Sequence, residues 1–191
     1  MYFGLSLRCT CCALLLLPAS GWAAPAQETS WVVRSASQPD ISDIKLSISY
    51  KGHAIQNGSE LTPSQASDPP EVEFDGSQTY SLMLVDPDVP SPQKPTNKDF
   101  VHWLVTNIPK SAVDNGQTVL QYMPPAPPPG TGYHRYMFKL YGQGQDTIQV
   151  KPFTSRTKFS PKHFADQYDL GDPLATFYFR AEAQGSVDES K

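Results

Sequence analysis

The chain has 191 residues, with 19 Asp and Glu against 15 Lys and Arg, which gives a formal net charge of −4. An acidic chain without a Lys/Arg cluster lacks the concentrated positive charge that nucleic acids and anionic membrane surfaces require. Its length suffices for one domain with a hydrophobic core, and we expect neither a second domain nor an internal repeat.

Residues 1–23 have the pattern of a secretory signal peptide. Arg8 is their only charge, Cys11–Ala19 is apolar, and Gly21 and Ala23 are the small residues at the expected cleavage site. The apolar run is far shorter than the roughly 20 residues that span a bilayer, which disfavours a membrane anchor. We therefore expect a secreted protein, cleaved near Ala23, that does not span a membrane.

All three cysteines, Cys9, Cys11 and Cys12, lie in this leader. Removing the 23 leader residues, Arg8 among them, leaves 168 residues with a net charge of −5. The mature protein is then expected to have no disulfide, no thiol nucleophile and no thiolate metal site. We expect a monomer without a cofactor, whose stability comes from its core.

The chain after the leader begins with an expected flexible arm, residues 24–40, and continues into one domain, residues 41–184. Apolar and polar residues alternate from Ile44 to Tyr50, which is the two-residue period of a half-buried strand. Asn57-Gly58-Ser59 matches the N-glycosylation pattern, so Asn57 is predicted to be an acceptor in a surface loop. Leu61–Pro70 contains three prolines and is expected to be a loop.

A mostly apolar strand is expected from Tyr80 to Val85, where Asp86-Pro87-Asp88-Val89-Pro90 stops it. Proline cannot donate a ladder hydrogen bond, so Asp86 and Asp88 are placed in a rigid turn. Their carboxylates either reach a ligand or accept backbone N–H groups. For Asp88, a purely structural ion pair with Arg135 is an equally good interpretation.

The next apolar run contains Val101, His102 and Trp103. Side chains alternate along a strand, so Val101 and Trp103 are predicted to share one face while His102 points to the other. A histidine in a strand is usually a packed or solvent-facing residue. Only its neighbours therefore make His102 a candidate for a site.

A third run, from residue 134 to 141, follows a segment rich in proline and glycine. The same alternation predicts that His134 and Tyr136 share a face and that Arg135 points away from it. Gly130 and Gly132 lie just before these residues. One Asp, two His residues and one Tyr thus become candidates for a single wall.

The one helix expected begins at Ser160, which can cap it, with Pro161 in the first helical position. It should end near Gly171, and Leu174–Arg180 should form the final strand. A polar tail, residues 185–191, ends the chain. Many short strands with turns between them, and one clear helix, indicate a mainly β domain.

Three motifs in order, DPDVP at 86–90, HWLV at 102–105 and PPGTGYHRY at 128–136, resemble the phosphatidylethanolamine-binding protein family. The resemblance extends over nearly the whole chain after the leader. It implies a β-sandwich with a large central antiparallel sheet, a smaller second sheet and one or two short helices. It also implies a small anion-binding pocket with residues 124–128 as its rim. The ligand-binding residues that we expect are Asp86, Asp88, His102, Pro124, Ala126, Gly130, Gly132, His134 and Tyr136.

An imidazole and backbone N–H groups of a Gly-rich loop can hold an oxyanion, and a phenol adds one more donor. Carboxylates suit such a site if they orient the histidines or accept from a ligand ammonium. We therefore expect a phosphate-containing phospholipid headgroup or a small carboxylic acid as the ligand. Pocket polarity alone does not choose between them.

Two other functions stay open. Some fungal relatives look to be encoded with secondary-metabolite pathways, where they assist the coupling of small acid or anhydride intermediates, as in maleidride-type dimerisation. In that role His134 would give acid–base help, and pathway enzymes would be partners. The family also resembles inhibitors of serine carboxypeptidases, which makes a serine protease a possible partner.

Two further enzyme classes are disfavoured by the sequence. Asp86, His102 and His134 have the composition of a metal site with two histidines and one carboxylate, but the usual close spacing of two of these ligands is missing. The resemblance implies no required metal either. A serine hydrolase of the G-x-S-x-G type is disfavoured because that motif is absent.

Overall fold

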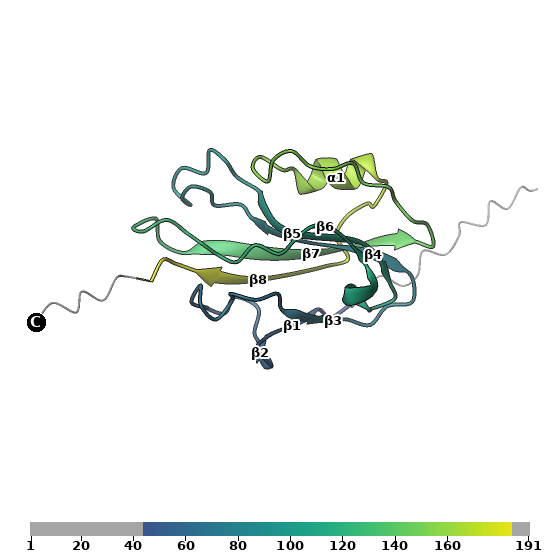
Figure 1. The fold of residues 1–191 in the computed structure, drawn as a ribbon, viewed down its shortest axis with the longest axis horizontal. Coiled ribbons are helices and arrows are strands. Elements are labelled where there is room, and N and C mark those ends of the chain that lie inside the picture. Colours follow the sequence, from purple (N-terminus) through teal and green to yellow (C-terminus); the bar gives the residue numbers. More distant parts are fainter. Residues whose placement is uncertain (1–43, 185–191) are drawn as a thin grey trace, which may run out of the picture. The chain divides into compact units, whose positions relative to one another are not determined.

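The computed structural model describes residues 44–184 of the chain (Figure 1). The expected signal peptide (1–23), the arm (24–40), the first three residues of the expected domain and the polar tail (185–191) lie outside the described residues. Within residues 44–184, no helix has the length and apolar character needed to cross a membrane.

A five-stranded antiparallel sheet forms the middle layer, in the order β6-β5-β4-β7-β8 (Figure 1). Its central strand β4 is apolar and buried, because layers cover both of its faces. The strands are β4 (Thr79–Asp86), β5 (Phe100–Pro109), β6 (Gln117–Leu120), β7 (His134–Gly144) and β8 (Ala175–Ala181).

A three-stranded antiparallel sheet, in the order β2-β1-β3, covers one face of the larger sheet (Figure 1). Its strands are β1 (Ser47–Tyr50), β2 (His53–Ile55) and β3 (Glu71–Glu73). Ile48, Tyr50 and Val72 from this sheet belong to the same buried cluster as Phe138 and Phe179. This cluster is the main hydrophobic core.

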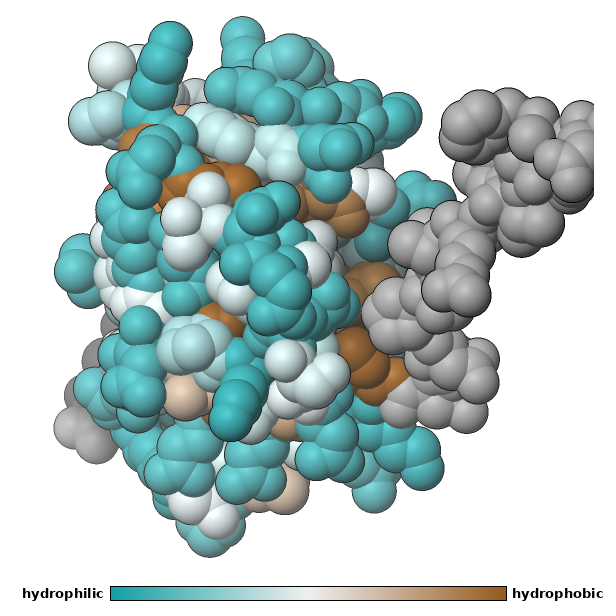
Figure 2. Space-filling model, turned by 90° about the vertical axis from the view of Figure 1, so that its right-hand side faces the viewer, coloured by the Kyte–Doolittle hydropathy of each residue, from teal (hydrophilic) through white to brown (hydrophobic). Residues whose placement is uncertain are grey.

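The opposite face of the five-stranded sheet is covered by the helix α1 (Pro161–Gln167) and the loop before it (Figure 1). The Ser160 side chain accepts a hydrogen bond from the His163 N–H at 3.1 Å, and Pro161 occupies the first turn, as the sequence predicts. Phe159 and Phe164 join Met83 in a second core cluster. Apolar side chains therefore fill both interlayer spaces. The face of the molecule shown in Figure 2 is mostly hydrophilic.

Two short strands were not expected from the sequence, β2 and β6, and a 3₁₀ turn, η1 (Val113–Asn115), precedes β6. The first strand is shorter than predicted, because it begins at Ser47. The mainly β architecture with a large sheet, a smaller sheet and one short α-helix is confirmed.

The prediction that Val101 and Trp103 share a face is wrong, because β5 carries a β-bulge at His102. Leu84 pairs with Trp103 and the next residue, Val85, pairs with Val101, which leaves His102 without a partner. Val101 consequently belongs to the second core cluster and Trp103 to the main core.

Candidate functional site

A cavity of about 150 Å³ lies where β4 ends and where β5 and β7 begin. These three ends meet because β5 and β7 both pair antiparallel with β4. The lining residues are Asp86, Val89, Phe100, His102, Met123, Pro124, Ala126, Pro127, Pro128, His134 and Tyr136. Six of the nine predicted ligand-binding residues are among them: Asp86, His102, Pro124, Ala126, His134 and Tyr136.

Asp86 and His134 form a buried pair in the wall of this cavity. His134 Nδ1 lies 2.8 Å from Asp86 Oδ2, and the two residues are 1% and 2% exposed. The other oxygen, Asp86 Oδ1, accepts the Asp88 backbone N–H at 2.7 Å. The backbone of the turn therefore holds the carboxyl group of Asp86, and this group holds the imidazole of His134, as expected for a carboxylate that orients a histidine.

Thr131 contacts the second ring nitrogen of His134. Its Oγ1 lies 2.9 Å from His134 Nε2 and donates to the Pro128 carbonyl at 2.7 Å. A hydroxyl has one proton and a carbonyl oxygen can only accept, so both contacts are satisfied only if Nε2 carries a proton. His134 is thus an N–H donor on its Nε2 side.

The Asp86–His134 pair has no net charge. One proton lies between Asp86 Oδ2 and His134 Nδ1, held as carboxylate and imidazolium or as carboxylic acid and neutral imidazole. Burial raises the pKa of Asp86, although the hydrogen bonds from His134 and from the Asp88 N–H act in the opposite direction. The pair therefore supplies a donor to the cavity without supplying a net positive charge.

His102 faces the cavity as a neutral imidazole. Burial lowers its pKa to about 4, despite a hydrogen bond from Nδ1 to the Met123 carbonyl at 2.8 Å. Because that carbonyl can only accept, Nδ1 carries the proton and Nε2 is an acceptor. The ring packs between Phe100 and Tyr136, with centroids 4.9 and 5.1 Å away. The bulge in β5 places it there.

Tyr136 shares the wall with His134, as the alternation along β7 predicts. Its ring stacks on Phe179 at 5.1 Å between centroids, and the side chain is buried. Burial raises the pKa of its hydroxyl, and the charge of Asp86 adds to this effect. The phenol therefore stays protonated at neutral pH.

Asp88 lies outside the residues that line the cavity. Both of its oxygens are bound by Arg135: Oδ2 accepts from the backbone N–H and from Nε at 2.9 Å each, and Oδ1 accepts from Nη2 at 2.7 Å. The geometry thus corresponds to the structural alternative considered for this carboxylate. Asp88 clamps the turn to the first residues of β7, which favours a structural role for this carboxylate over contact with a ligand.

Gly130 and Gly132 also lie outside the lining residues. Both have positive φ angles, +77° and +78°, which L side chains rarely adopt. Their contribution visible here is conformational, because they flank Thr131 in the loop that brings its hydroxyl to His134.

The sequence did not predict the contact of Thr131 with His134. The position of Thr131 three residues before His134, between two glycines, was the available signal. Phe100 and Met123, which also line the cavity, were not predicted because neither carries a polar side chain. Met123 contacts His102 through its backbone carbonyl.

Asp86, His102 and His134 are not arranged as metal ligands. The Nδ1 atoms of the two histidines are occupied by Met123 O and by Asp86. Among the residues that the structure describes, 44–184, no group of three His, Cys, Asp or Glu side chains is placed to hold a metal ion.

The predicted glycosylation acceptor, Asn57, lies on the surface in the loop after β2. Its Oδ1 accepts the Tyr178 N–H at 2.9 Å. The amide nitrogen, to which a glycan attaches, is on the other side of that group. Occupancy of the site stays a prediction.

Comparison with known proteins identifies the relatives of the chain. Residues 48–179 match the family model described as phosphatidylethanolamine-binding protein. Among curated proteins, the chain is 38% identical over 144 residues to Protein TERMINAL FLOWER 1 of Arabidopsis thaliana, covering 73% of this chain and 80% of that one.

Solved structures show the same fold at lower identity. The carboxypeptidase Y inhibitor, in complex with its cognate proteinase, superimposes with a TM-score of 0.63 at 23% identity, covering 74% of this chain and 84% of the inhibitor. A phosphatidylethanolamine-binding protein from Plasmodium vivax gives a TM-score of 0.58 at 23% identity, with 74% and 86% of the two chains covered.

Proposed function

The chain belongs to the phosphatidylethanolamine-binding protein family, and on that premise we propose that it is a secreted protein that binds a small anion in the His134 cavity. The ligand is a phosphate-containing headgroup or a small carboxylic acid. Secretion is supported by the signal-peptide pattern of residues 1–23.

The size of the cavity supports a ligand of headgroup size. Its volume of about 150 Å³ is well below the roughly 300–1,000 Å³ of sites for drug-sized molecules. The phosphate group of a lipid, with a short substituent, fits such a space, whereas the acyl chains do not. A bound lipid would therefore keep its chains outside.

The observation that carries the proposal is the 2.9 Å contact between His134 Nε2 and Thr131 Oγ1, which, with the Thr131–Pro128 hydrogen bond, assigns a proton to Nε2. The Nε2–H group donates to Thr131 Oγ1, and it can donate to an oxyanion of a ligand once the hydroxyl turns away. Asp86 keeps Nδ1 of the same ring in place. The Tyr136 hydroxyl is a second potential donor in the same wall.

His102, a neutral imidazole among the lining residues, brings a potential acceptor, because its proton is on Nδ1. A ligand that combines an acidic oxygen with a hydrogen-bond donor of its own can bind both the donor of His134 and the acceptor of His102. Phosphoethanolamine brings an ammonium group, and a monoprotonated dicarboxylic acid brings a hydroxyl. Such ligands are expected to bind more tightly than inorganic phosphate.

Titration of phosphate, phosphoethanolamine and succinate into isotope-labelled protein, followed by NMR, tests the proposal. We expect saturable shifts at His134 and Tyr136, and their loss in His134→Ala. Because that variant leaves Asp86 unpaired and can unfold, Thr131→Val is the sharper change. It removes the competing acceptor, so phosphoethanolamine should bind about 2- to 10-fold more tightly, the equivalent of one neutral hydrogen bond.

Thr131→Ser keeps the hydroxyl and is the matched control, with an affinity close to that of the wild type. Weaker binding in Thr131→Val would mean that Thr131 contacts the ligand and does not compete with it. A folded His134→Ala protein that binds the same ligands equally well would refute the assignment of the pocket.

A second candidate function rests on the same pair. A histidine with one nitrogen held by a buried carboxylate and the other at a cavity wall has the arrangement of an acid–base group. It supports the role of an accessory protein in coupling small acid or anhydride intermediates, including the maleidride-type pathways considered above. New ligand signals that grow over hours with a maleic anhydride-type acid, and vanish in His134→Ala, are expected under this hypothesis.

Inhibition of a serine carboxypeptidase stays a hypothesis of a different class. The likeness to the carboxypeptidase Y inhibitor, at 23% identity, concerns the fold. A panel of serine carboxypeptidases assayed with micromolar protein tests it directly. No inhibition across the panel would dispose of it.

A further inference from the structure

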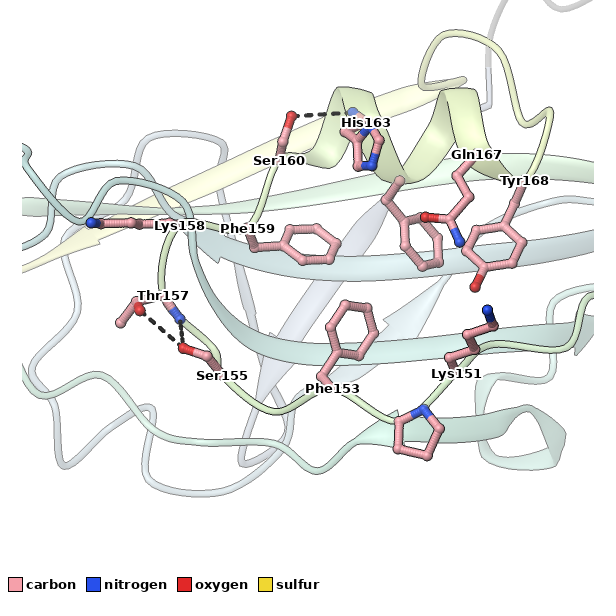
Figure 3. Close-up of a pocket in the computed structure, with 12 residues that line it drawn as sticks. Lys151, Phe153, Ser155, Thr157, Lys158, Phe159, Ser160, His163, Gln167 and Tyr168 are labelled. Carbon is pink, nitrogen blue, oxygen red and sulfur yellow. Dashed lines mark hydrogen bonds between the residues drawn. The ribbon is translucent and has the colours of Figure 1, made fainter.

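A second cavity, of about 370 Å³, lies under α1 on the face of the five-stranded sheet opposite the small sheet (Figure 3). Its walls are the loop from Lys151 to Ser160 and one side of α1. It shares no lining residue with the His134 cavity. Nothing in the proposed function uses it.

The loop that forms one wall is firmly attached to the sheet. Its backbone forms one hydrogen bond with β5, from Val101 N–H to Arg156 O at 2.9 Å, and one with the residue just before β5, from Phe159 N–H to Asp99 O at 3.1 Å. The Arg156 guanidinium donates to the carbonyls of Val101, His102 and Gln121 at 2.8–3.0 Å. The cavity is therefore preformed, which lowers the ordering cost of binding.

The interior of this cavity is aromatic. Phe153, Phe159, Phe164 and Tyr168 all line it. Phe159 lies edge-on to Phe153 at 5.5 Å between centroids, and Phe164 contacts Tyr168 at 4.8 Å. Phe159 and Phe164 are buried, whereas Phe153 and Tyr168 are half-buried. Exposed ring surface in a hollow favours a flat apolar group, because aromatic rings pack in offset or edge-to-face arrangements.

Polar groups gather at one end of the aromatic interior. The ends of Lys151, Gln167 and Tyr168 point toward one another in Figure 3, whereas the amine of Lys158 points away from the rings. Within residues 44–184, Lys151 has no carboxylate within salt-bridge distance. An ammonium, an amide and a phenol are together a set of donors suited to a carboxylate.

We propose that this cavity is a second ligand site, which binds a small carboxylic acid with an aromatic body. The ring system lies among Phe153, Phe159 and Tyr168, and the carboxylate is bound at Lys151. Charge complementarity selects the acid, since Lys151 lies at one end of the aromatic interior, in an acidic protein, without a carboxylate partner among residues 44–184.

NMR titration with 2-naphthoate, a flat aromatic acid, tests the site. We expect saturable shifts at residues of α1 and of the loop 151–160, unchanged when the His134 cavity is saturated with phosphoethanolamine. Lys151→Met should weaken binding roughly tenfold or more, the loss of one charge-assisted hydrogen bond. Lys162→Met is the control, because Lys162 is exposed on α1, pairs with Asp166 and does not line the cavity.

Three results would overturn the proposal. One is the absence of saturable shifts in the α1 region at millimolar 2-naphthoate. A second is equal binding of the uncharged 2-naphthamide, which would mean that Lys151 contributes nothing. The third is a Lys151→Met protein with wild-type affinity. The readout is separate from phosphoethanolamine binding, so this site and the His134 site can fail independently.

Discussion

The clamp between Asp88 and Arg135 makes a prediction about stability that separates a structural from a ligand-binding role. The Asp88 side chain is 4% exposed and accepts two charged hydrogen bonds from the guanidinium of Arg135, whose side chain is 55% exposed. Arg135→Met keeps the apolar stem and deletes the charge. A buried carboxylate is then left with only the Arg135 backbone N–H.

The expected cost follows from those contacts. Charged hydrogen bonds contribute about 1.5–3 kcal/mol each, so two of them set an upper limit of about 3–6 kcal/mol. Because the guanidinium is half in solvent, screening reduces the expected loss in unfolding free energy to about 2–3 kcal/mol. For a chain of this size this lowers Tm by roughly 5–10 °C. Urea denaturation at pH 7 measures the free energy directly.

The pH dependence gives an independent check. Burial alone would raise the pKa of Asp88, but the hydrogen bonds and the charge of Arg135 outweigh it and hold that pKa below its usual value. The carboxylate therefore contributes stability that is present above pH ~4 and is lost as the pH falls through the folded-state pKa. For that reason, the difference in unfolding free energy between the wild type and Arg135→Met should become smaller in acid.

Two further variants serve as controls for Arg135→Met. Lys162→Met removes an exposed pair with Asp166 and should cost less than about 0.5 kcal/mol. Asp88→Asn with Arg135→Met removes the buried charge as well, so it should recover much of the loss. If Arg135→Met were no more destabilising than Lys162→Met, Asp88 would not be a buried, clamped carboxylate, and its exclusion from the ligand site would lose its physical basis.

Two other predictions follow from the core and the cavity. Burial lowers the pKa of His102 to about 4, so between pH 6.5 and 4 this residue binds a proton in the unfolded chain but not in the folded protein. The free energy of unfolding should therefore fall by roughly 3 kcal/mol from pH 6.5 to 4. In His102→Gln, urea titrations should show a weaker dependence of that free energy on pH. An unchanged slope in His102→Gln would show that the ring is protonated in the fold. Gly116 has a φ of −76°, which suits any residue, but a Cβ added there would lie 2.6 Å from Val105 and 2.7 Å from Ile108. Gly116→Ala should therefore lower the free energy of unfolding in urea by about 1–3 kcal/mol. No loss would mean that these two core side chains shift freely.

The sequence predicted which residues share the wall of the His134 cavity where the strands are regular. His134 and Tyr136 share a wall because β7 pairs with β8 without interruption from residue 134 to 140, so alternation holds there. His102 also reached the predicted cavity, although by a route that alternation does not describe. The bulge in β5 changes the faces of Val101 and Trp103, and a single sequence does not reveal an unpaired residue within an apolar run.

The rest of the site depends on contacts between distant segments, which local patterns do not encode. Thr131 was missed because a threonine between two glycines is typical of a turn, and its bond to His134 exists only in the folded loop. The cavity under α1 was missed for a related reason. Phe153, Phe159 and Tyr168 share no single period, and a loop fastened by Arg156 is what brings them together.

The pairing of the two carboxylates of the DPDVP turn explains how an acidic segment can border the proposed anion site. Asp88 is neutralised outward by Arg135, and Asp86 is neutralised inward by His134, so neither presents a free negative charge to the cavity. The same pairing leaves no free positive charge there either. Recognition must then depend on the positions of one donor at His134 and one acceptor at His102, and not on long-range attraction. Binding at this site should consequently depend little on ionic strength, whereas binding at Lys151, which lies in solvent, should weaken as salt is added.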